Sequence, residues 1–444
     1  MDGKSAVGRV MRDRPVPEAE GEFVLLGFPD INGSIRGKAL RPSAFRSACE
    51  EGTVITDLLL ALDPEDVPIA DFERIGTRSG AADLILRPEP GTLGDLTWCP
   101  GWSLCLATPF WPDGSTCELA SREVLRRSLG QLSALGFEAI AALEFEVRVF
   151  HADGQPLSGG ISYSMSELSV FDELARGLGP ALAGLGIELT AVHTEAGPGL
   201  LELNVAARPA MRAADDAVML KFAVKEVARK LGLRASFLAK TTAGEEGSSG
   251  HVHFSFWQDG LNTFAQFSPL GQPSATLSAA LAGTLDHLAG ASLLLNPTIN
   301  SYKRLVPGFF APVNATWGID NRSAALRVIR SELPARCRIE CRRPGADVNP
   351  YLALAAITVA ACDGITRQSV PPAPTDGDAS QLAGLPGLPA SLEAALAAFE
   401  SDTVLRAGLG QAFSEYYATS RAWELRAWQN IVSDWERNRY ERAV

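Results

Sequence analysis

Two glutamates in the segment Leu143-Glu144-Phe145-Glu146-Val147 are the first residues of this chain whose type and spacing could do chemistry. Because side chains alternate along a strand, Glu144 and Glu146 would share one face, and the apolar residues between them would pack on the other. Two neighbouring carboxylates raise each other's pKa unless a cation lies between them, and hard divalent cations prefer oxygen ligands. The pattern predicts a metal site, and a strand with one solvated face is the alternative.

A histidine-containing segment is the second candidate. The chain has five histidines, and two of them lie in Gly250-His251-Val252-His253-Phe254, behind a Gly-Ser-Ser-Gly turn. His251, His253 and Ser255 would share one face of a strand, because apolar residues alternate with them. Taken alone this pattern is weakly diagnostic, and a structural strand is the alternative.

A third candidate is the pair Glu195 and Glu202, which flank a Gly-Pro-Gly turn at 197–199. Such a turn can fold the two carboxylates toward each other. A hairpin with two exposed acids is the alternative for this segment.

Arginines recur in the last third of the chain, and one carboxylate lies among them. The residues are Arg304, Arg322, Arg327, Arg338, Glu340 and Arg342. Arg338, Glu340 and Arg342 alternate onto one face of a strand, and arginines interleaved with a carboxylate suit phosphate oxygens beside a metal. Surface salt bridges could explain one such segment. They explain poorly why five segments carry such residues, namely 143–147, 193–204, 247–256, 300–327 and 336–342.

The elements that must position these residues divide the chain into two units. The first is a small α+β unit at 21–108 after a flexible leader at 1–20, with a strand at 22–28, a helix at 43–50 and an extended segment at 83–87. A turn-rich boundary at 109–114 precedes a catalytic unit at 113–444, which has helices at 121–135, 211–231 and 274–289. A Pro/Gly-rich loop at 371–389 leads to amphipathic helices with Trp423, Trp428 and Trp435 as packing anchors.

Composition excludes several classes of protein. A chain of 444 residues exceeds one ordinary core and suggests two to three domains. The 46% apolar and 21% charged residues are typical of globular proteins, and no apolar run of about 20 residues predicts a membrane span. A net charge of −12 argues against nucleic acid as a partner. The seven cysteines lack a CxxC pair, and the first residues lack the apolar core of a signal peptide, so a cytoplasmic location is expected.

In order and over nearly the whole chain, these segments resemble the glutamine synthetase family. The matching stretches are Glu144-Phe145-Glu146, the turn from Glu195 to Glu202, GHVH from Gly250, NSYKRLVPG from Asn300, DNRSAALR from Asp320, RIECR from Arg338, and PGADVNPYLALAA from Pro344. The resemblance implies an α+β fold with a small N-terminal β-grasp-like domain and a large catalytic domain, whose curved antiparallel sheet is flanked by helices. It also implies stacked hexameric rings, typically a dodecamer, with sites between subunits.

The resemblance also implies the roles of individual residues. Two Mg²⁺ or Mn²⁺ ions would be held, one by Glu146, Glu195 and Glu202 and the other by Glu144, His251 and Glu340. The ATP co-substrate would be contacted by His253 and Ser255, and its phosphates by Arg322, Arg327 and Arg338. Glutamate and its acyl phosphate would be bound by Arg304 and Arg342 beside Gly247, with Arg304, Arg322 and Arg342 as the catalytic residues.

One departure from the family pattern changes the expected substrate. Members that use ammonia carry a glutamate six residues after the arginine of the YKR motif, where this chain has Phe310. An apolar ring cannot capture ammonium by charge, but it can pack against the carbon skeleton of a larger amine. Leu200, where family members often have glutamine, makes the same pocket more apolar.

The expected activity is therefore an ATP-dependent ligase that joins the γ-carboxylate of glutamate to an organic amine through a γ-glutamyl phosphate, giving a γ-glutamylamide. A true glutamine synthetase using ammonia and a catalytically inactive structural relative are the alternatives. The amine and the pathway stay open, and the departures at Leu200, Thr190 and Glu246 leave open whether the acid is glutamate itself. The absence of tyrosine from the loop at 371–389 argues against control by adenylylation.

Overall fold

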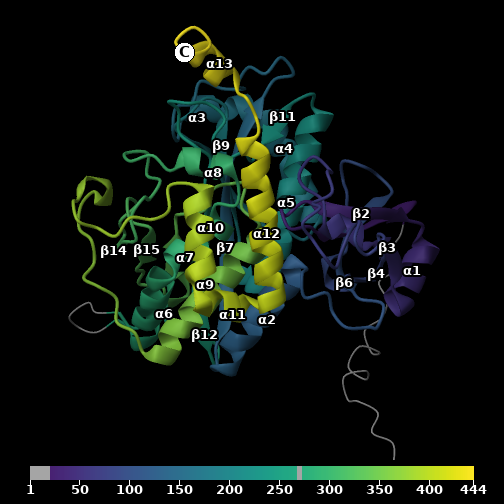
Figure 1. Ribbon diagram of the computed structural model, residues 1–444, viewed down its shortest axis with the longest axis horizontal. Coiled ribbons are helices and arrows are strands. Elements are labelled where there is room, and N and C mark those ends of the chain that lie inside the picture. Colours follow the sequence, from purple (N-terminus) through teal and green to yellow (C-terminus); the bar gives the residue numbers. More distant parts are fainter. Residues whose placement is uncertain (1–20, 268–272) are drawn as a thin grey trace, which may run out of the picture.

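The computed structural model describes residues 21–267 and 273–444, so the leader expected at 1–20 lies outside the described residues. Figure 1 shows a smaller N-terminal part, in purple, beside a larger part that holds the remaining strands and most of the helices. The two parts carry separate sheets. The mixed architecture confirms the expected α+β class.

The N-terminal part is built on a sheet with the order β2-β1-β6-β4-β3, in which β5 pairs with β6. Its strands are β1 (Phe23–Pro29), β2 (Ile35–Leu40), β3 (Thr53–Thr56), β4 (Asp83–Pro88), β5 (Gly94–Asp95) and β6 (Trp102–Phe110). Strands β1 and β6 pair in parallel, and the other pairs of this sheet are antiparallel. The turn-rich segment expected at 109–114 begins at Trp111, because β6 continues to Phe110 opposite Ile85. The division of the chain into domains stays a prediction.

The larger sheet has the order β14-β15-β16-β12-β7-β9-β8, with β10 and β11 also pairing with β7 and β13 with β12. Its strands are β7 (Glu138–Phe150), β8 (Leu189–Thr194), β9 (Leu200–Val205), β10 (Arg208–Pro209), β11 (Arg234–Ser236), β12 (Gly250–Gln258), β13 (Leu261–Asn262), β14 (Trp317–Ile319), β15 (Leu326–Ile329) and β16 (Arg338–Cys341). The antiparallel expectation is wrong only for β14 and β15, which run parallel. Strand β7 is central and contacts both halves of the sheet.

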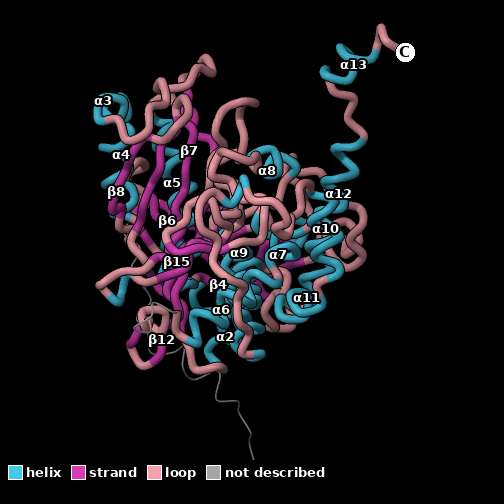
Figure 2. Tube along the Cα trace, turned by 90° about the vertical axis from the view of Figure 1, so that its left-hand side faces the viewer, coloured by secondary structure: helices cyan, strands magenta, loops and turns pink. Residues whose placement is uncertain are grey.

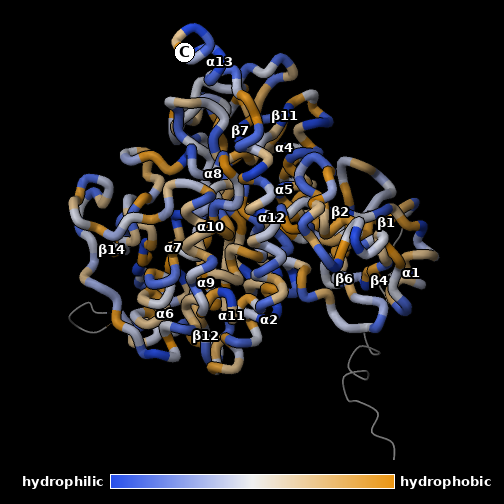
Figure 3. Tube along the Cα trace, in the orientation of Figure 1, coloured by the Kyte–Doolittle hydropathy of each residue, from blue (hydrophilic) through white to orange (hydrophobic). Residues whose placement is uncertain are grey.

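Helices cover one face of this sheet and leave the other face for the site. The α-helices of the described chain are α1 (Pro42–Glu51), which packs on the N-terminal sheet, α2 (Ser121–Ala134), α3 (Met165–Leu168), α4 (Asp172–Gly184), α5 (Ala210–Lys230), α6 (Ala275–Asp286), α7 (Leu288–Leu295), α8 (Ile299–Arg304), α9 (Pro350–Arg367), α10 (Leu392–Ser401), α11 (Thr403–Leu409), α12 (Gln411–Gln429) and the projecting α13 (Asp434–Tyr440). In Figure 2 most strands lie to the left and α7, α9, α10, α11 and α12 lie to the right. Figure 3 shows hydrophobic residues along α7, α9 and α10, where the helical core is packed.

The segment expected to be one helix at 274–289 is broken into α6 and α7, which meet at an angle of 74°. The residue at the break is His287, whose backbone leaves the helical conformation with φ −100 and ψ 2. Its ring lies between two carboxylates, one from the residue that joins α10 to α11 and one from α9: Nδ1 is 2.8 Å from Asp402 Oδ2, and Nε2 is 3.0 Å from Asp363 Oδ2. A straight helix was expected because the apolar spacing continues through His287. The contacts with Asp363 and Asp402 are tertiary and leave no local pattern.

The His287 contacts predict a pH-dependent contribution to stability. Burial lowers the pKa of His287, but the hydrogen bonds with Asp402 and Asp363 outweigh it and raise the pKa above the ordinary value of 6.5. A raised folded-state pKa means that the stabilisation is complete below about 6.5 and is lost as the pH rises through the folded-state pKa. We expect His287→Gln to lower the free energy of unfolding by roughly 1 to 3 kcal/mol at pH 6 and by less at pH 8.5, measured by thermal unfolding. The exposed His151 gives the control His151→Gln, and a pH-independent loss in His287→Gln would contradict the prediction.

The C-terminal residues leave the body of the molecule. Figures 1 and 2 show α13 projecting beyond α12. Trp423 packs against the core as expected, but Trp428 and Trp435 are 50% and 60% exposed. The prediction that all three tryptophans anchor the helices within one chain is therefore wrong for these two. Ile431 and Val432 are also exposed. The C-terminal arm, residues 430–444, therefore presents apolar side chains outside the core of its own chain.

Within residues 21–267 and 273–444, no single helix is long and apolar enough to cross a membrane. The bent pair α6 and α7 reaches that length and hydropathy only when the two are counted together.

Candidate active site

Strand β7 positions the first pair of acids as the alternation predicts. Leu143, Phe145 and Val147 are almost completely buried against the helices. Glu144 and Glu146 project from the opposite face, where they line a cavity of about 720 Å³. The sequence alone therefore identified the chemical face of this strand.

On one side of β7, the strand register brings His251, His253 and the carboxylate of Glu340 close to Glu144. His251 lies opposite Glu144, and His253 lies opposite Glu340. His253 Nε2 is 2.7 Å from Glu144 Oε2. His251 Nδ1 is 3.4 Å from Glu340 Oε1 and 3.8 Å from Glu144 Oε2. The two histidines and two carboxylates thus form one compact cluster.

On the other side of β7, the hairpin of β8 and β9 brings Glu195 and Glu202 together around a residue that sequence reasoning did not select. His193 Nε2 is 3.0 Å from Glu202 Oε1, and His193 Nδ1 is 3.3 Å from Glu195 Oε1. Glu202 lies opposite Glu146 in the register of β7 and β9. Glu146 Oε2 accepts a hydrogen bond of 2.7 Å from the backbone N–H of Ser249.

Ligand atoms close enough to share an ion come together in two groups, Glu144 with His253 and Glu340, and His193 with Glu195 and Glu202. These groups contain His253 and His193 where His251 and Glu146 were expected, so the expected ligand sets stay predictions. His193 could have been found from the sequence, because it precedes Glu195 by two residues on the same strand face.

Two observations fit divalent cations at these groups. Burial and the charges of Glu146 and Glu202 raise the pKa of Glu195 to about 7, and the contact with His193 offsets this effect only in part. His251 Nε2 is buried and has no hydrogen-bond partner among the described residues. Carboxylate oxygens with imidazole nitrogens are a ligand set that suits Mg²⁺ or Mn²⁺. The residues present therefore fit the metals that the sequence analysis expects.

The expected arginines surround Glu340 and line the same cavity. Arg342 Nη1 is 2.5 Å from Glu340 Oε1, and Arg327 Nη1 is 3.1 Å from Glu340 Oε2. Burial opposes ionisation of Glu340, but His251 and Arg342 outweigh it and lower the pKa to about 2. Arg338 Nε donates to His253 Nδ1 at 3.0 Å. Arg322 is exposed at the rim of the cavity.

The expected acid-binding residues meet on the floor of the cavity. Arg304 is 4% exposed, and burial lowers its pKa to about 10, so it stays charged at neutral pH. Gly247 packs directly against it, because a Cβ at this position would lie 2.5 Å from Arg304 Cγ. Leu200 is buried and lines the same cavity.

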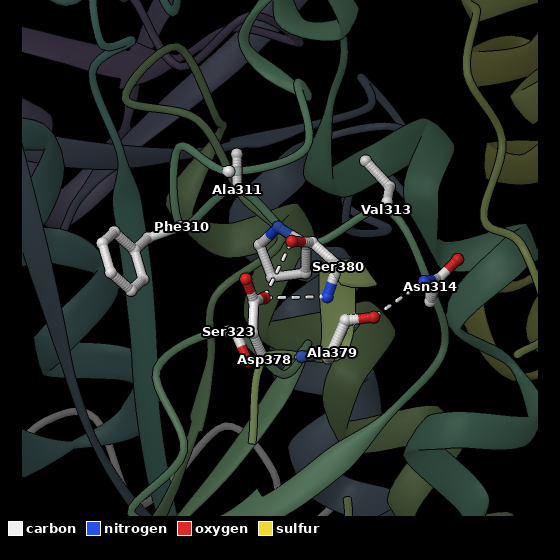
Figure 4. A pocket seen from close by; sticks show the side chains of 10 residues that line it. Phe310, Ala311, Val313, Asn314, Ser323, Asp378, Ala379 and Ser380 are labelled. Atoms are coloured by element: carbon white, nitrogen blue, oxygen red, sulfur yellow. Dashed lines mark hydrogen bonds between the residues drawn. The ribbon is translucent and has the colours of Figure 1, made fainter. Parts of the chain in front are cut away.

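Phe310 lies at the rim rather than in the interior. It is 64% exposed and has a left-handed backbone with φ +50, which is uncommon for a bulky residue. It lines the large cavity, a neighbouring cavity of about 470 Å³ and a small one of about 40 Å³. Figure 4 shows the small cavity, with the Phe310 ring pointing away from Asn314 and Ser380. The ring therefore lies between the large cavity and the two smaller cavities beside it.

A second cavity of about 480 Å³ adjoins the first and shares Glu144, Glu202 and His253 with it. Ser255 and Thr190 line this second cavity, and the nucleotide contact expected of Ser255 stays a prediction. Tyr163 lines both cavities, and its ring stacks on His193 with 4.3 Å between the centroids. No pattern near Tyr163 pointed to the site, because it lies in a loop that only the tertiary structure brings there.

Asn204 also joins the site without having been predicted. Its Nδ2 donates to Glu144 Oε1 at 2.6 Å and to Glu202 Oε1 at 2.9 Å, so it bridges the two acidic groups. The signal available in the sequence was its position two residues after Glu202, on the same face of β9.

Comparison with known proteins fits this geometry. Residues 118–440 match the family model for the catalytic domain of glutamine synthetase, which is well over half of the chain. The chain belongs to the glutamine synthetase family.

Individual relatives of this family member are similar over nearly their full length. It is 34% identical over 435 residues to the glutamate–isopropylamine ligase of a Pseudomonas species, covering 94% of this chain and 95% of the relative. It is 34% identical over 436 residues to the γ-glutamylethanolamide synthetase GlnA4 of Streptomyces coelicolor, covering 95% and 93%. A solved GmaS/ADP complex superposes with a TM-score of 0.84 at 30% identity, covering 95% of this chain and 97% of the other. The expected glutamine synthetase fold is confirmed.

Proposed function

We propose that this protein is an ATP-dependent ligase that joins the γ-carboxylate of glutamate to a primary organic amine and releases ADP and phosphate. The observation that carries the proposal is the position of Phe310, an apolar ring at the rim of a cavity that is also lined by acids and arginines. Relatives named for isopropylamine and for ethanolamide support an organic amine as the second substrate.

The charges lining the cavity suit transfer of the γ-phosphoryl group of ATP to a carboxylate. Arg304 and Arg342, both buried, would hold the carboxylates of glutamate and the acyl phosphate. Arg322, Arg327 and Arg338 would face the phosphates of ATP, whose adenosine would occupy the cavity that contains Ser255. This reaction depends on positioning and electrostatic stabilisation, which a set of fixed arginines provides.

Divalent cations would be held by Glu144, Glu146, Glu195, Glu202, His251 and Glu340, with His193 and His253 as additional ligands or hydrogen-bond partners. Bound there, Mg²⁺ or Mn²⁺ would neutralise the charge that develops on the phosphoryl oxygens. The carboxylates of this chain would hold such ions at the junction of the two cavities, because Glu144 and Glu202 line both.

The amine would then attack the acyl phosphate from the side of Phe310. Its nitrogen forms the amide bond, phosphate leaves, and the nitrogen releases a proton to a nearby base. Leu200 and Phe310 provide apolar surface for the carbon skeleton of the amine, and this surface offers no charge to retain ammonium.

The test is release of ADP by the purified protein with Mg²⁺, ATP and glutamate, using ammonia, short alkylamines, ethanolamine, aromatic amines and polyamines in parallel. We expect turnover with at least one organic amine and little with ammonia. Turnover with ammonia alone would replace the proposal with glutamine synthesis, and no turnover with any amine would refute a glutamate:amine ligase.

The raised pKa of Glu195 predicts how metal affinity depends on pH. The carboxyl must lose its proton to bind a cation, so metal competes with the proton and affinity rises as the pH increases through about 7. Mn²⁺ titration calorimetry at pH 6, 7 and 8 should show tighter binding at each step. Calorimetry in buffers of different ionisation enthalpy should show proton release at pH 6. Affinity that is flat across this range would contradict the prediction, and removal of metal with a chelator should abolish ADP release.

Self-association into hexameric rings, with a dodecamer as the expected assembly, is part of the proposal. The projecting C-terminal arm supports contacts between copies, since Ile431, Val432 and Trp435 are exposed in a single chain. Sedimentation velocity of the full chain tests the assembly, and a monomer at micromolar concentration would contradict it.

A further inference from the structure

Arg148 is a buried cation that the proposed reaction does not use. It lies on β7 two residues after Glu146, on the same face as Glu144 and Glu146, but it does not line the catalytic cavity. Its side chain is 1% exposed. A fully buried arginine is costly unless its charge is paired and its N–H groups find acceptors, so its partners define its role.

The guanidinium of Arg148 joins two loops that are far apart in the sequence. Nη1 donates to the carbonyl oxygen of Pro198 at 2.8 Å and to Glu245 Oε2 at 2.6 Å. Nη2 donates to the carbonyl oxygen of Glu246 at 2.9 Å. Both nitrogens are thus bound to backbone carbonyls of segments that border the site, at Pro198 and at Glu246, and the charge is paired with Glu245.

The first of these loops carries proposed metal ligands. Pro198 lies in the turn between Glu195 and Glu202, and the guanidinium also packs against this turn at Gly197, where a Cβ would lie 2.9 Å from Nη2. The backbone of the turn is also joined to β7 by the hydrogen bond from Val149 N–H to the Gly199 carbonyl and by the pairing of Leu200 with Arg148, whereas Arg148 supplies the side-chain contact to Pro198. The guanidinium of Arg148 is therefore one of the contacts that hold the segment after Glu195 against β7.

The second loop carries the proposed acid-binding Gly247. Its carbonyl at Glu246 is held by Arg148, and its carbonyl at Glu245 accepts a hydrogen bond from Lys240 Nζ. Lys240 is in turn fixed to α8 by Asn300, whose Oδ1 accepts from the Lys240 N–H at 2.8 Å. The loop at 241–248 is therefore hydrogen-bonded to Arg148 and, through Lys240, to α8, the helix that contains Arg304.

We propose that Arg148 is a positioning residue that sets the separation between the metal-binding turn and the acid-binding loop. Its planar fork reaches acceptors on both loops at once, which a single ammonium group cannot reproduce. The Glu245 carboxylate orients this fork. The proposal rests on the ligand and substrate roles given under Proposed function, but it concerns the geometry of this chain alone.

The test compares Arg148→Lys with Glu245→Gln, using amide hydrogen exchange and Mn²⁺ titration. In Arg148→Lys we expect faster exchange in both 196–200 and 241–248, and Mn²⁺ affinity lower by about tenfold or more, as for other residues that support metal ligands. In Glu245→Gln the bond from Arg148 to Pro198 survives. Faster exchange is then expected only in 241–248, with Mn²⁺ affinity within about twofold of the original.

Arg421→Lys is the matched control, because Arg421, like Arg148, is almost completely buried. It donates to a backbone carbonyl outside these two loops, that of Pro297. This substitution should leave exchange in both loops and Mn²⁺ affinity unchanged. Wild-type exchange in both loops of Arg148→Lys, or equal acceleration in Arg421→Lys, would overturn the proposal. If Arg148→Lys fails to fold, unchanged exchange in 241–248 of Glu245→Gln overturns it instead. Neither readout requires an amine, so a failed amine assay leaves this test intact.

Discussion

Glu340→Gln is expected to lower the rate of ADP release by about 100-fold or more, because it removes an anionic ligand at the centre of the proposed metal site. Glu340 is 1% exposed and lies between Arg327, Arg342 and His251. The substituted amide keeps the size of the side chain but not its charge. The neighbouring cations then lose their partner, and Mn²⁺ loses a ligand.

The measurement is ADP release with the preferred amine at saturating ATP and glutamate, together with Mn²⁺ titration of the same preparation. Glu332→Gln is the control, since Glu332 is exposed and lines no part of the cavity. It should keep the original rate and metal affinity. A wild-type rate in Glu340→Gln would refute the assignment of the site, and circular dichroism distinguishes loss of a ligand from loss of the fold.

Phe310→Glu is expected to weaken the use of an organic amine and to increase the use of ammonia. A carboxylate at the rim of the cavity can attract ammonium and accept its proton, while the apolar surface for an organic amine is lost. We expect kcat/KM with the organic amine to fall by about tenfold or more, and the rate with ammonia to rise from its low starting value. The exposed position of Phe310 means that the substitution creates no buried charge.

Steady-state kinetics with both amines at pH 8 measures these changes. Ile319→Glu places the same charge in the neighbouring cavity, which Ile319 lines without reaching the catalytic one. It should change neither rate. If Phe310→Glu also changes neither, Phe310 does not contact the amine and the argument from its side chain fails.

Local sequence patterns were sufficient to predict which face of a strand a side chain occupies. The alternation from Leu143 to Val147 indicated that Glu144 and Glu146 share a polar face, and the structure has them there. The same reasoning placed His251, His253 and Ser255 together on β12. Strand geometry fixes these relations, because successive side chains must point to opposite faces.

Local patterns failed where a contact joins distant segments. The break at His287 depends on Asp363 and Asp402, and the stacking of Tyr163 on His193 depends on the path of a loop. The tryptophans of the C-terminal arm were expected in the core because amphipathic spacing does not reveal whether a partner face exists in the same chain. In each case the deciding contact is far away in the sequence.

By itself, the sequence indicated the α+β class, the family through its ordered motifs, and most of the acids and arginines at the site, because these depend on residue types at fixed spacings; it did not select His193. Only the tertiary structure decided which of them touch. It placed His193 between Glu195 and Glu202, joined both acidic groups through Asn204, and set Arg148 beneath two loops. Strand register and loop path set these distances, and both depend on the packing of the whole chain rather than on any one segment.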